Sequence, residues 1–371
     1  MKAIGIILAG GKGSRLSKLT ESRATAAIPL GSSYRAIDWP LSNMTDSGIN
    51  KVAVITQYNS RSLTDHLSSS KWWNFGRKHG GLFILSPYLA NDSSLLYKGT
   101  ADSMYQNLSF LKRSNEEFVV ITNGEGIYSG DYNYLLEHHV EKNADLTMVV
   151  KRIYDDDIGQ YGVVQMDDNN RLLYLEEKPL APETNLVNLA IYVIRRELLI
   201  KLLEELSEDL RYDFVTDLIV RYRKKLNISC FQVNDDFYWR TINSVQNYYR
   251  CNMDFLDEKI NMIFNHENHS ICTKPKDEPP AKYNFNAEVR NALVGNGSII
   301  SGKVENSVLF RRVVVKDNAC VERSILLEGT IVEEGCTLKH VITDRNCRIT
   351  SGTKIIGTEE EPIILGKNTV V

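Results

Sequence analysis

Short aliphatic runs alternate with helix-like segments over the first two thirds of the chain. Four runs are nearly continuous in apolar residues, as expected of strands buried on both faces: Ala3–Ala9, Val52–Thr56, Phe118–Thr122 and Leu146–Val150. Apolar residues recur at helical spacing in Thr100–Arg113, and Asp131–Lys142 is a second helix-like segment. This alternation predicts βαβ units and a mainly parallel sheet. Later β-like runs extend it as a mixed sheet: Val163–Met166, Leu189–Ile194 and Ile228–Val233.

A different periodicity begins near residue 300. Apolar or small residues recur at steps of six in two neighbouring rows: Val308, Val314, Cys320, Leu326, Val332 and Leu338, then Val313, Ala319, Ile325, Ile331 and Thr337. A period of six predicts a β-helix in which each step forms one flat side of a coil, and such coils commonly build oligomers. The alternative is a set of sandwich strands, which would not keep this step over five repeats.

A composition break separates the two patterns. Residues 265–285 lack periodicity and contain three of the nine prolines, Pro275, Pro279 and Pro280. Such a stretch is typical of a linker. The sequence therefore predicts a first domain over residues 1–258, a linker over 259–285 and a β-helix domain over 286–371.

Composition excludes several classes of protein. Over 371 residues, 44 basic and 47 acidic side chains give a net charge of −3, which argues against a generally basic nucleic-acid binder. No apolar run approaches the ~20 residues that span a bilayer, and the N-terminus lacks the pattern of a signal peptide. The six cysteines form no CxxC pair and are expected to be reduced, mostly buried thiols. We therefore expect a cytoplasmic protein.

A glycine-rich loop follows the first predicted strand. Gly10, Gly11 and Gly13 allow close backbone approach to a ligand, and successive N–H groups there can form an anion-binding nest. Lys12 and Arg15 add positive charge for a polyphosphate. The spacing is neither GxxxxGK[ST] nor GxGxxG, so an ordinary strand-to-helix turn is the alternative. Its place after the first strand of an α/β sheet favours nucleotide binding.

Several longer motifs resemble one family. The stretches are LAGGKGSRLSKLT, YRAIDWPLSNMTDSGI, YKGTADSMYQNL, GIYSGDY, EEKP, DFVTDLI, YWR, SIISGKVENSVLF and GTKIIG. Together they resemble the sugar-1-phosphate nucleotidyltransferases, and within them the bacterial ADP-glucose pyrophosphorylases (glucose-1-phosphate adenylyltransferases) of glycogen synthesis. The resemblance implies a Rossmann-like nucleotidyltransferase domain, a C-terminal left-handed parallel β-helix and tetramers.

The resemblance also implies a reaction and residue roles. Glucose 1-phosphate attacks the α-phosphate of ATP, pyrophosphate leaves, and Mg²⁺ is held by carboxylates and phosphates. The matched nucleotide-binding positions are Leu8, Gly10, Gly11, Lys12 and Gly13, with Arg15 beside the reacting phosphates. The matched sugar-phosphate positions are Tyr97, Gly162, Glu177, Lys178 and Asn188. Lys12 stands for the usual arginine and Asn188 for the usual serine; Asp213 lies on a matched segment but is assigned no role.

Three departures fall on positions of the chemistry. Thr25 stands for a lysine expected beside the phosphates, Glu125 for the catalytic, metal-binding aspartate, and Thr241 for the second metal carboxylate. Glu125 is the one metal ligand left, and Mg²⁺ binding is expected to be weak or absent. This pattern resembles the GlgD-type regulatory subunits, which implies a heterotetramer with a catalytic subunit. ATP and glucose 1-phosphate stay possible ligands.

The activator region that the resemblance implies is also altered. Ser22 stands where some members have an activator-binding lysine, whereas Arg23 and Arg35 persist. Direct sensitivity to a sugar-phosphate activator is therefore not expected.

Two other functions remain open from the sequence. One is an active adenylyltransferase that uses Glu125 as metal ligand, with a substitute carboxylate such as Asp131. The other is a hexapeptide-repeat acyltransferase, for which His340 is the histidine available on the β-helix.

Overall fold

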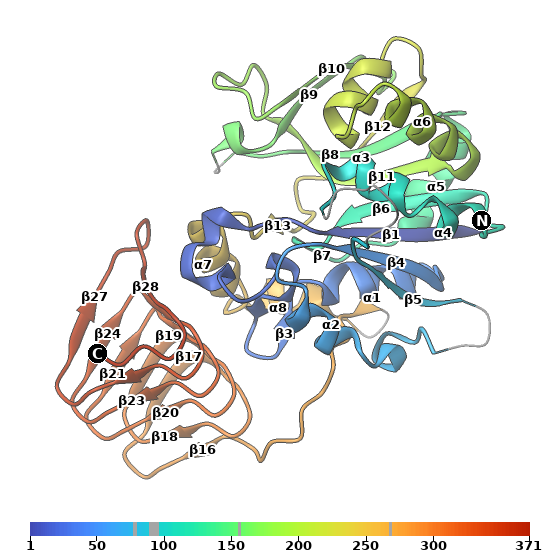
Figure 1. Cartoon of the computed structure of the whole chain (residues 1–371). Helices are drawn as coiled ribbons and strands as arrows, with labels where there is room; N and C mark the ends of the chain where they lie inside the picture. The colour runs from blue at the N-terminus through green and yellow to red at the C-terminus, as the bar shows by residue number, and fades with distance from the viewer. Residues whose placement is uncertain (77–79, 89–95, 155–156, 267–268) are drawn as a thin grey trace. The chain divides into compact units, whose positions relative to one another are not determined.

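The computed structural model describes residues 1–371 except 77–79, 89–95, 155–156 and 267–268 (Figure 1). The chain divides into two compact units, and each unit contains segments that are distant in sequence. The first unit comprises Met1–Gly11, Pro40–Gln57 and Trp73–Trp239; the second comprises Lys12–Trp39, Tyr58–Trp72 and Arg240–Val371. This grouping by contact in space does not follow the sequence domains, whose bounds stay a prediction.

A nine-stranded sheet forms the centre of the first unit. Its order is β10-β9-β11-β6-β1-β4-β5, with β8 beside β11 and β12 beside β8. The strands are β1 (Ala3–Ala9), β4 (Lys51–Thr56), β5 (Gly81–Leu85), β6 (Phe118–Asn123), β8 (Leu146–Arg152), β9 (Gly162–Met166), β10 (Leu172–Glu177), β11 (Leu186–Arg195) and β12 (Ile228–Gln232). Only β10 and β11 run against the others, so the predicted mainly parallel mixed sheet is confirmed.

Helices cover both faces of this sheet (Figure 1). On one face, the sheet forms a single apolar cluster with four elements: α3 (Thr100–Gln106), α4 (Leu108–Lys112), α6 (Arg196–Glu208) and the π-helical turn η5 (Phe214–Val220). The helix α5 (Tyr132–Glu141) contacts β8, β11 and β12. The predicted helix Thr100–Arg113 is interrupted at Asn107, because its side-chain amide donates to Ser103 O and to the Tyr97 hydroxyl. Short elements complete the unit: β7 (Gly126–Tyr128) and η4 (Ile158–Gln160).

The second unit joins N-terminal segments to the C-terminal coil. Its short elements are η1 (Ser14–Thr20), η2 (Thr25–Ala27), β2 (Pro29–Leu30), β3 (Tyr34–Arg35), α2 (Arg61–Leu67), α7 (Val245–Asp254), α8 (Glu258–Phe264), β14 (Asn265–His266) and β15 (His269–Ser270). Three elements straddle the unit boundaries: α1 (Asp38–Asp46), η3 (Ser70–Trp73) and β13 (Trp239–Thr241). Trp39, Phe255 and Phe264 form an aromatic cluster with ring centroids 5.4–5.6 Å apart. The helix α8 therefore occupies the start of the predicted linker, part of which, residues 267–268, lies outside the described residues.

The C-terminal coil is a parallel β-helix with three columns of strands. One column is β16 (Lys282–Tyr283), β18 (Ile299–Ile300), β20 (Val314–Val315), β23 (Ile331–Val332) and β26 (Arg348–Ile349). The other two contain β17 (Glu288–Val294), β19 (Lys303–Leu309), β21 (Cys320–Glu322), β22 (Ile325–Leu326), β24 (Thr337–Lys339), β25 (Val341–Thr343), β27 (Lys354–Ile356) and β28 (Ile363–Leu365). All their pairings are parallel, consistent with the predicted left-handed coil.

The step of six needs one correction. Val304 pairs with Val321 and Val321 with Leu338, so successive turns lie 17 residues apart. A row at steps of six therefore drifts by one position per turn. For this reason Val308 and Leu326 are buried, whereas Val314 and Cys320 of the same row are only partly buried.

Two smaller expectations concern the thiols and membranes. The six cysteines are thiols; four are buried, Cys320 is partly buried and Cys272 is exposed. None of the helices in the described part of the chain is long and apolar enough to cross a membrane.

Candidate functional site

Three of the predicted sugar-phosphate residues lie together in the first unit. Gly162, at the start of β9, pairs with Glu177 at the end of β10. A Cβ atom on Gly162 would lie 2.8 Å from Glu177 Oε2 and 3.6 Å from Asn188 Cβ. The absence of a side chain on Gly162 lets the carboxylate lie close to the backbone, and the strand pairing brings these positions together.

A carboxylate and an ammonium group stand side by side at this position. Lys178 Nζ lies 3.6 Å from Glu177 Oε1, and both side chains are partly exposed. Burial raises the pKa of Glu177, while Lys178 opposes that shift and Asp213 adds to it. Such a pair can accept hydrogen bonds from sugar hydroxyls and attract a phosphate.

Tyr97 lies in the first unit and is held by two residues: Gln57, which lies outside the sequence motifs, and Asn107, which belongs to the motif YKGTADSMYQNL. Its N–H donates to Gln57 Oε1 at 2.6 Å, and its hydroxyl accepts from Asn107 Nδ2 at 2.9 Å. Gln57 follows β4 directly, but nothing in its sequence surroundings marks it as a binding residue. Asp213 was left without a role; one of its oxygens caps η5 and the other accepts from Thr100 Oγ1 at 3.2 Å.

The amide of Asn188 is used within the fold. Its Nδ2 donates to the Tyr192 hydroxyl at 2.6 Å, and its Oδ1 accepts from the Ala190 N–H at 3.0 Å. These bonds lie where β11 shifts register against β8. Asn188 therefore stabilises an irregular strand as well as bordering Gly162.

Glu125 faces the first part of the glycine-rich loop. The Gly124 N–H donates to Leu8 O at 2.9 Å, which ties the turn after β6 to the end of β1. A Cβ atom on Gly11 would lie 3.0 Å from Glu125 Oε1, whereas one on Gly10 would have its nearest neighbour, Gln57 Cβ, at 3.4 Å. The half-buried carboxylate thus lies against the loop that is predicted to bind nucleotide.

The rest of the loop belongs to the second unit. Gly13 takes φ 64° before η1, and a Cβ atom there would meet Thr25 and Thr20. Lys12 and Arg15 are exposed. Thr25 is only 2% exposed, and within the described chain its hydroxyl has no hydrogen-bond partner. A neutral, buried group therefore lies beside Gly13.

Of the two positions matched to metal ligands, only position 125 carries a carboxylate. Thr241, the other position matched to a metal ligand, is a hydroxyl only 7% exposed on β13. Asp131 caps α5 by accepting from the Asn133 N–H at 2.9 Å. Among the described residues no group of three or more His, Cys, Asp or Glu is placed to hold a metal ion. Glu125 would hold Mg²⁺ together with phosphates and water.

The two arginines of the predicted activator region have different partners. Arg23 forms a buried ion pair with Asp344, which follows β25, at 2.7 Å. Arg35 donates to Ser62 O and lines a cleft with Lys274, Lys276, Arg311 and Arg345. Burial, with repulsion from neighbouring arginines, lowers the pKa of Arg35 to about 10. Ser22 is exposed.

A Rossmann-like sheet with a glycine-rich loop after β1, followed by a parallel β-helix, defines a nucleotidyltransferase with a hexapeptide-repeat coil. Residues 4–258 match the Nucleotidyl transferase family and residues 279–362 the GlmU-like C-terminal hexapeptide family. Glucose-1-phosphate adenylyltransferase of Bacillus mycoides is 34% identical over 360 residues, covering 95% of this chain and 94% of the relative. The Clostridium novyi enzyme of that name is 35% identical over 321 residues, covering 86% of this chain and 84% of the relative. The chain belongs to the glucose-1-phosphate adenylyltransferase family.

Proposed function

We propose that the chain is a non-catalytic or weakly active regulatory subunit of ADP-glucose pyrophosphorylase. It supports the synthesis of ADP-glucose from ATP and glucose 1-phosphate for glycogen by joining a catalytic subunit in a cytoplasmic heterotetramer. One observation carries the proposal. The sugar-phosphate residues Gly162, Glu177 and Asn188 adjoin one another, while Thr25 and Thr241 place hydroxyls at two positions of the chemistry.

The surroundings of the changed residues support a loss of rate. Thr25 is buried and carries no charge, so it cannot neutralise a phosphate. Glu125 keeps the charge of aspartate but adds a methylene, and Mg²⁺ demands near-ideal octahedral geometry. Removing one preorganised electrostatic group typically costs ~10²–10³ in rate, and losses among groups that act together are not additive. Two such losses with a displaced ligand are enough to make turnover very slow.

An active adenylyltransferase is the second candidate. It is favoured by the half-buried Glu125 carboxylate against Gly11 and by the exposed cations Lys12 and Arg15. In that case Mg²⁺ would bind Glu125, and the purified chain would synthesise ADP-glucose without a partner subunit.

The acyltransferase alternative is not proposed. His340 is buried, its Nδ1 lies 2.8 Å from the Tyr249 hydroxyl, and that hydroxyl also donates to Arg323 O. The imidazole is therefore part of the contact between α7 and the coil.

Co-expression with a catalytic subunit tests the partnership. We expect one mixed species by native mass spectrometry, with kcat or substrate affinity different from the catalytic subunit alone. The matched control is the same catalytic subunit expressed without this chain. Two separate homo-oligomers, or a mixed species with unchanged kinetics, would contradict the proposal.

A further inference from the structure

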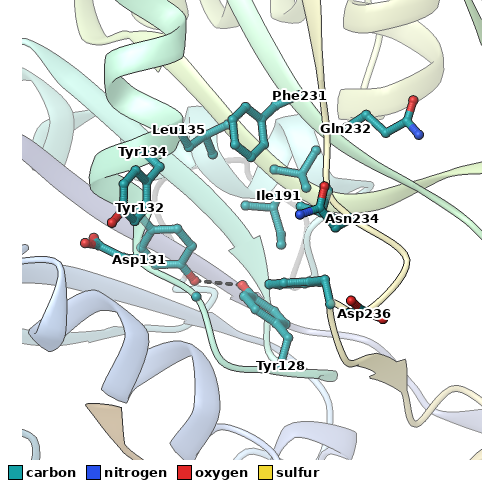
Figure 2. A pocket seen from close by; sticks show the side chains of 14 residues that line it. Tyr128, Asp131, Tyr132, Tyr134, Leu135, Ile191, Phe231, Gln232, Asn234 and Asp236 are labelled. Atoms are coloured by element: carbon teal, nitrogen blue, oxygen red, sulfur yellow. Dashed lines mark hydrogen bonds between the residues drawn. The ribbon is translucent and has the colours of Figure 1, made fainter. Parts of the chain in front are cut away.

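A cavity of about 430 Å³ lies on the α5 face of the sheet (Figure 2). Its wall comes from three parts of the first unit: the segment from Tyr128 to Leu135, the sheet residues Val149 and Ile191, and the segment from Phe231 to Phe237. This volume lies within the range of pockets that hold small molecules.

The sheet separates this cavity from the apolar cluster beneath α3 and α6. Met148 and Val150 belong to that cluster, whereas Val149 between them lines the cavity. Likewise, Tyr192 belongs to that cluster, whereas the preceding residue, Ile191, lines the cavity. Because successive side chains of a strand point to opposite faces, the cavity lies on the other side of the sheet.

The cavity presents aromatic faces. Figure 2 shows the rings of Tyr132, Tyr134 and Phe231 around Ile191. The hydroxyls of Tyr128 and Tyr132 bond to each other at 2.7 Å, and Thr122 Oγ1 lies 3.0 Å from the Tyr128 hydroxyl. Those polar atoms are satisfied internally, so the rings offer apolar surface. Aromatic walls of this kind suit stacking against a planar ring.

The charge around the cavity disfavours an anion. Among the described residues that line it, Asp131 and Asp236 are acidic and none is Lys or Arg. The nearby Lys151 ammonium donates to the backbone carbonyls of Asp235 and Phe237, both at 2.6 Å. That ammonium anchors the segment 234–237 and is already engaged. A phosphate in the cavity would therefore meet carboxylates without a compensating cation.

Two exposed amides line the cavity, Gln232 and Asn234. Figure 2 shows the Asn234 side chain beside Ile191, whereas the Gln232 side chain extends away from the tyrosine rings. An amide offers a donor and an acceptor side by side, which matches the polar edge of a nucleobase. We propose that this cavity binds an uncharged, nucleoside-sized heteroaromatic molecule, with its ring against Tyr134 and Phe231 and its polar edge at Asn234. This inference does not depend on the proposed regulatory role.

Calorimetric titration of the full chain with adenosine tests the site. The pocket variants are Tyr134→Ala and Asn234→Ala; the matched control is Tyr154→Ala. Tyr134 and Tyr154 are 67% and 65% exposed, so each truncation removes a tyrosine of equal exposure. Melting curves check that every variant is folded. We expect adenosine to bind wild type and control equally. Tyr134→Ala removes a stacking partner and should weaken binding about five- to hundred-fold, and Asn234→Ala removes a hydrogen-bonding amide and should weaken it about two- to tenfold.

Two further probes fix the class of ligand. Adenosine 5′-monophosphate, if it binds elsewhere on the chain, should bind with an affinity that the pocket variants leave unchanged. Maltose should not bind in a way that depends on Tyr134 or Asn234. The inference is overturned if adenosine does not bind at millimolar concentration or binds all four proteins equally. It is also overturned if the pocket variants weaken the binding of the monophosphate as much as that of adenosine. Maltose binding that depends on Tyr134 or Asn234 would overturn it as well.

Discussion

The ion pair between Arg23 and Asp344 is central to the second unit. Its atoms lie 2.7 Å apart, and the two side chains are 3% and 1% exposed. The Asp344 carboxylate also accepts from the Arg345 N–H at 2.6 Å. We consider Asp344→Asn, which keeps the shape of the side chain and removes its charge.

The expected loss of stability follows from the charge that the substitution leaves unpaired. Arg23 would stay buried without a counter-charge, and it also repels the partly buried guanidinium groups of Arg35 and Arg345. Breaking a buried pair by removing one partner typically costs about 3–5 kcal/mol. We expect Asp344→Asn to lower the unfolding free energy of the second unit by about that amount. The joint replacement of Arg23 and Asp344 by Leu should restore most of it, because no uncompensated charge remains.

Urea unfolding of the full chain, followed by circular dichroism, measures the loss. Asp317→Asn is the control: Asp317 is an exposed carboxylate on the same coil, and surface substitutions usually change stability by less than about 0.5 kcal/mol. A loss below about 1 kcal/mol for Asp344→Asn, or a loss that salt abolishes, would refute the reasoning, since either is the behaviour of a solvated pair.

Three further predictions concern other regions. Gly162→Ala places a Cβ 2.8 Å from Glu177 Oε2, so the end of that side chain must move, and glucose 1-phosphate binding measured by calorimetry should become weaker. Gly76→Ala is the control: its Cβ meets nothing within 4 Å, and it should leave glucose 1-phosphate binding unchanged. Burial lowers the pKa of His139 to about 4, so the unfolded chain takes up a proton first as pH falls below about 6.5. The unfolding free energy should then drop by up to about 3 kcal/mol between pH 6.5 and 4. His139→Gln should remove this contribution to the pH dependence of the unfolding free energy. Phe285, beside the edge strand β16, is 102% exposed; Phe285→Asp should reduce assembly with the catalytic subunit in size-exclusion chromatography, whereas unchanged assembly would exclude this residue from the interface.

Much of the sheet could be predicted because its strands are buried on both faces. The run Ala3–Ala9 is both the predicted strand and β1. The helix over Thr100–Arg113 was predicted too long, because periodicity does not show that Asn107 bonds to Tyr97 and Ser103. The grouping of residues 12–39 with the coil was not predictable either, since it depends on contacts between distant segments such as Arg23 and Asp344.

The proximity of two predicted site residues follows from the strands that carry them. Gly162 and Glu177 adjoin as two paired strands require. The support of Tyr97 by Gln57 was not predictable, because an isolated glutamine after a strand carries no pattern. The α5-face cavity was also invisible in the sequence, since its wall combines three separate segments of ordinary core residues.

The turnover of the purified full chain tests the central claim most directly. The assay supplies ATP, glucose 1-phosphate and Mg²⁺ and compares wild type with the triple variant Thr25→Lys, Glu125→Asp and Thr241→Asp. The account predicts little or no turnover for wild type and a rate at least ~10²-fold higher for the triple variant. Wild-type turnover at ordinary enzyme rates of ~1–10³ s⁻¹ would contradict it.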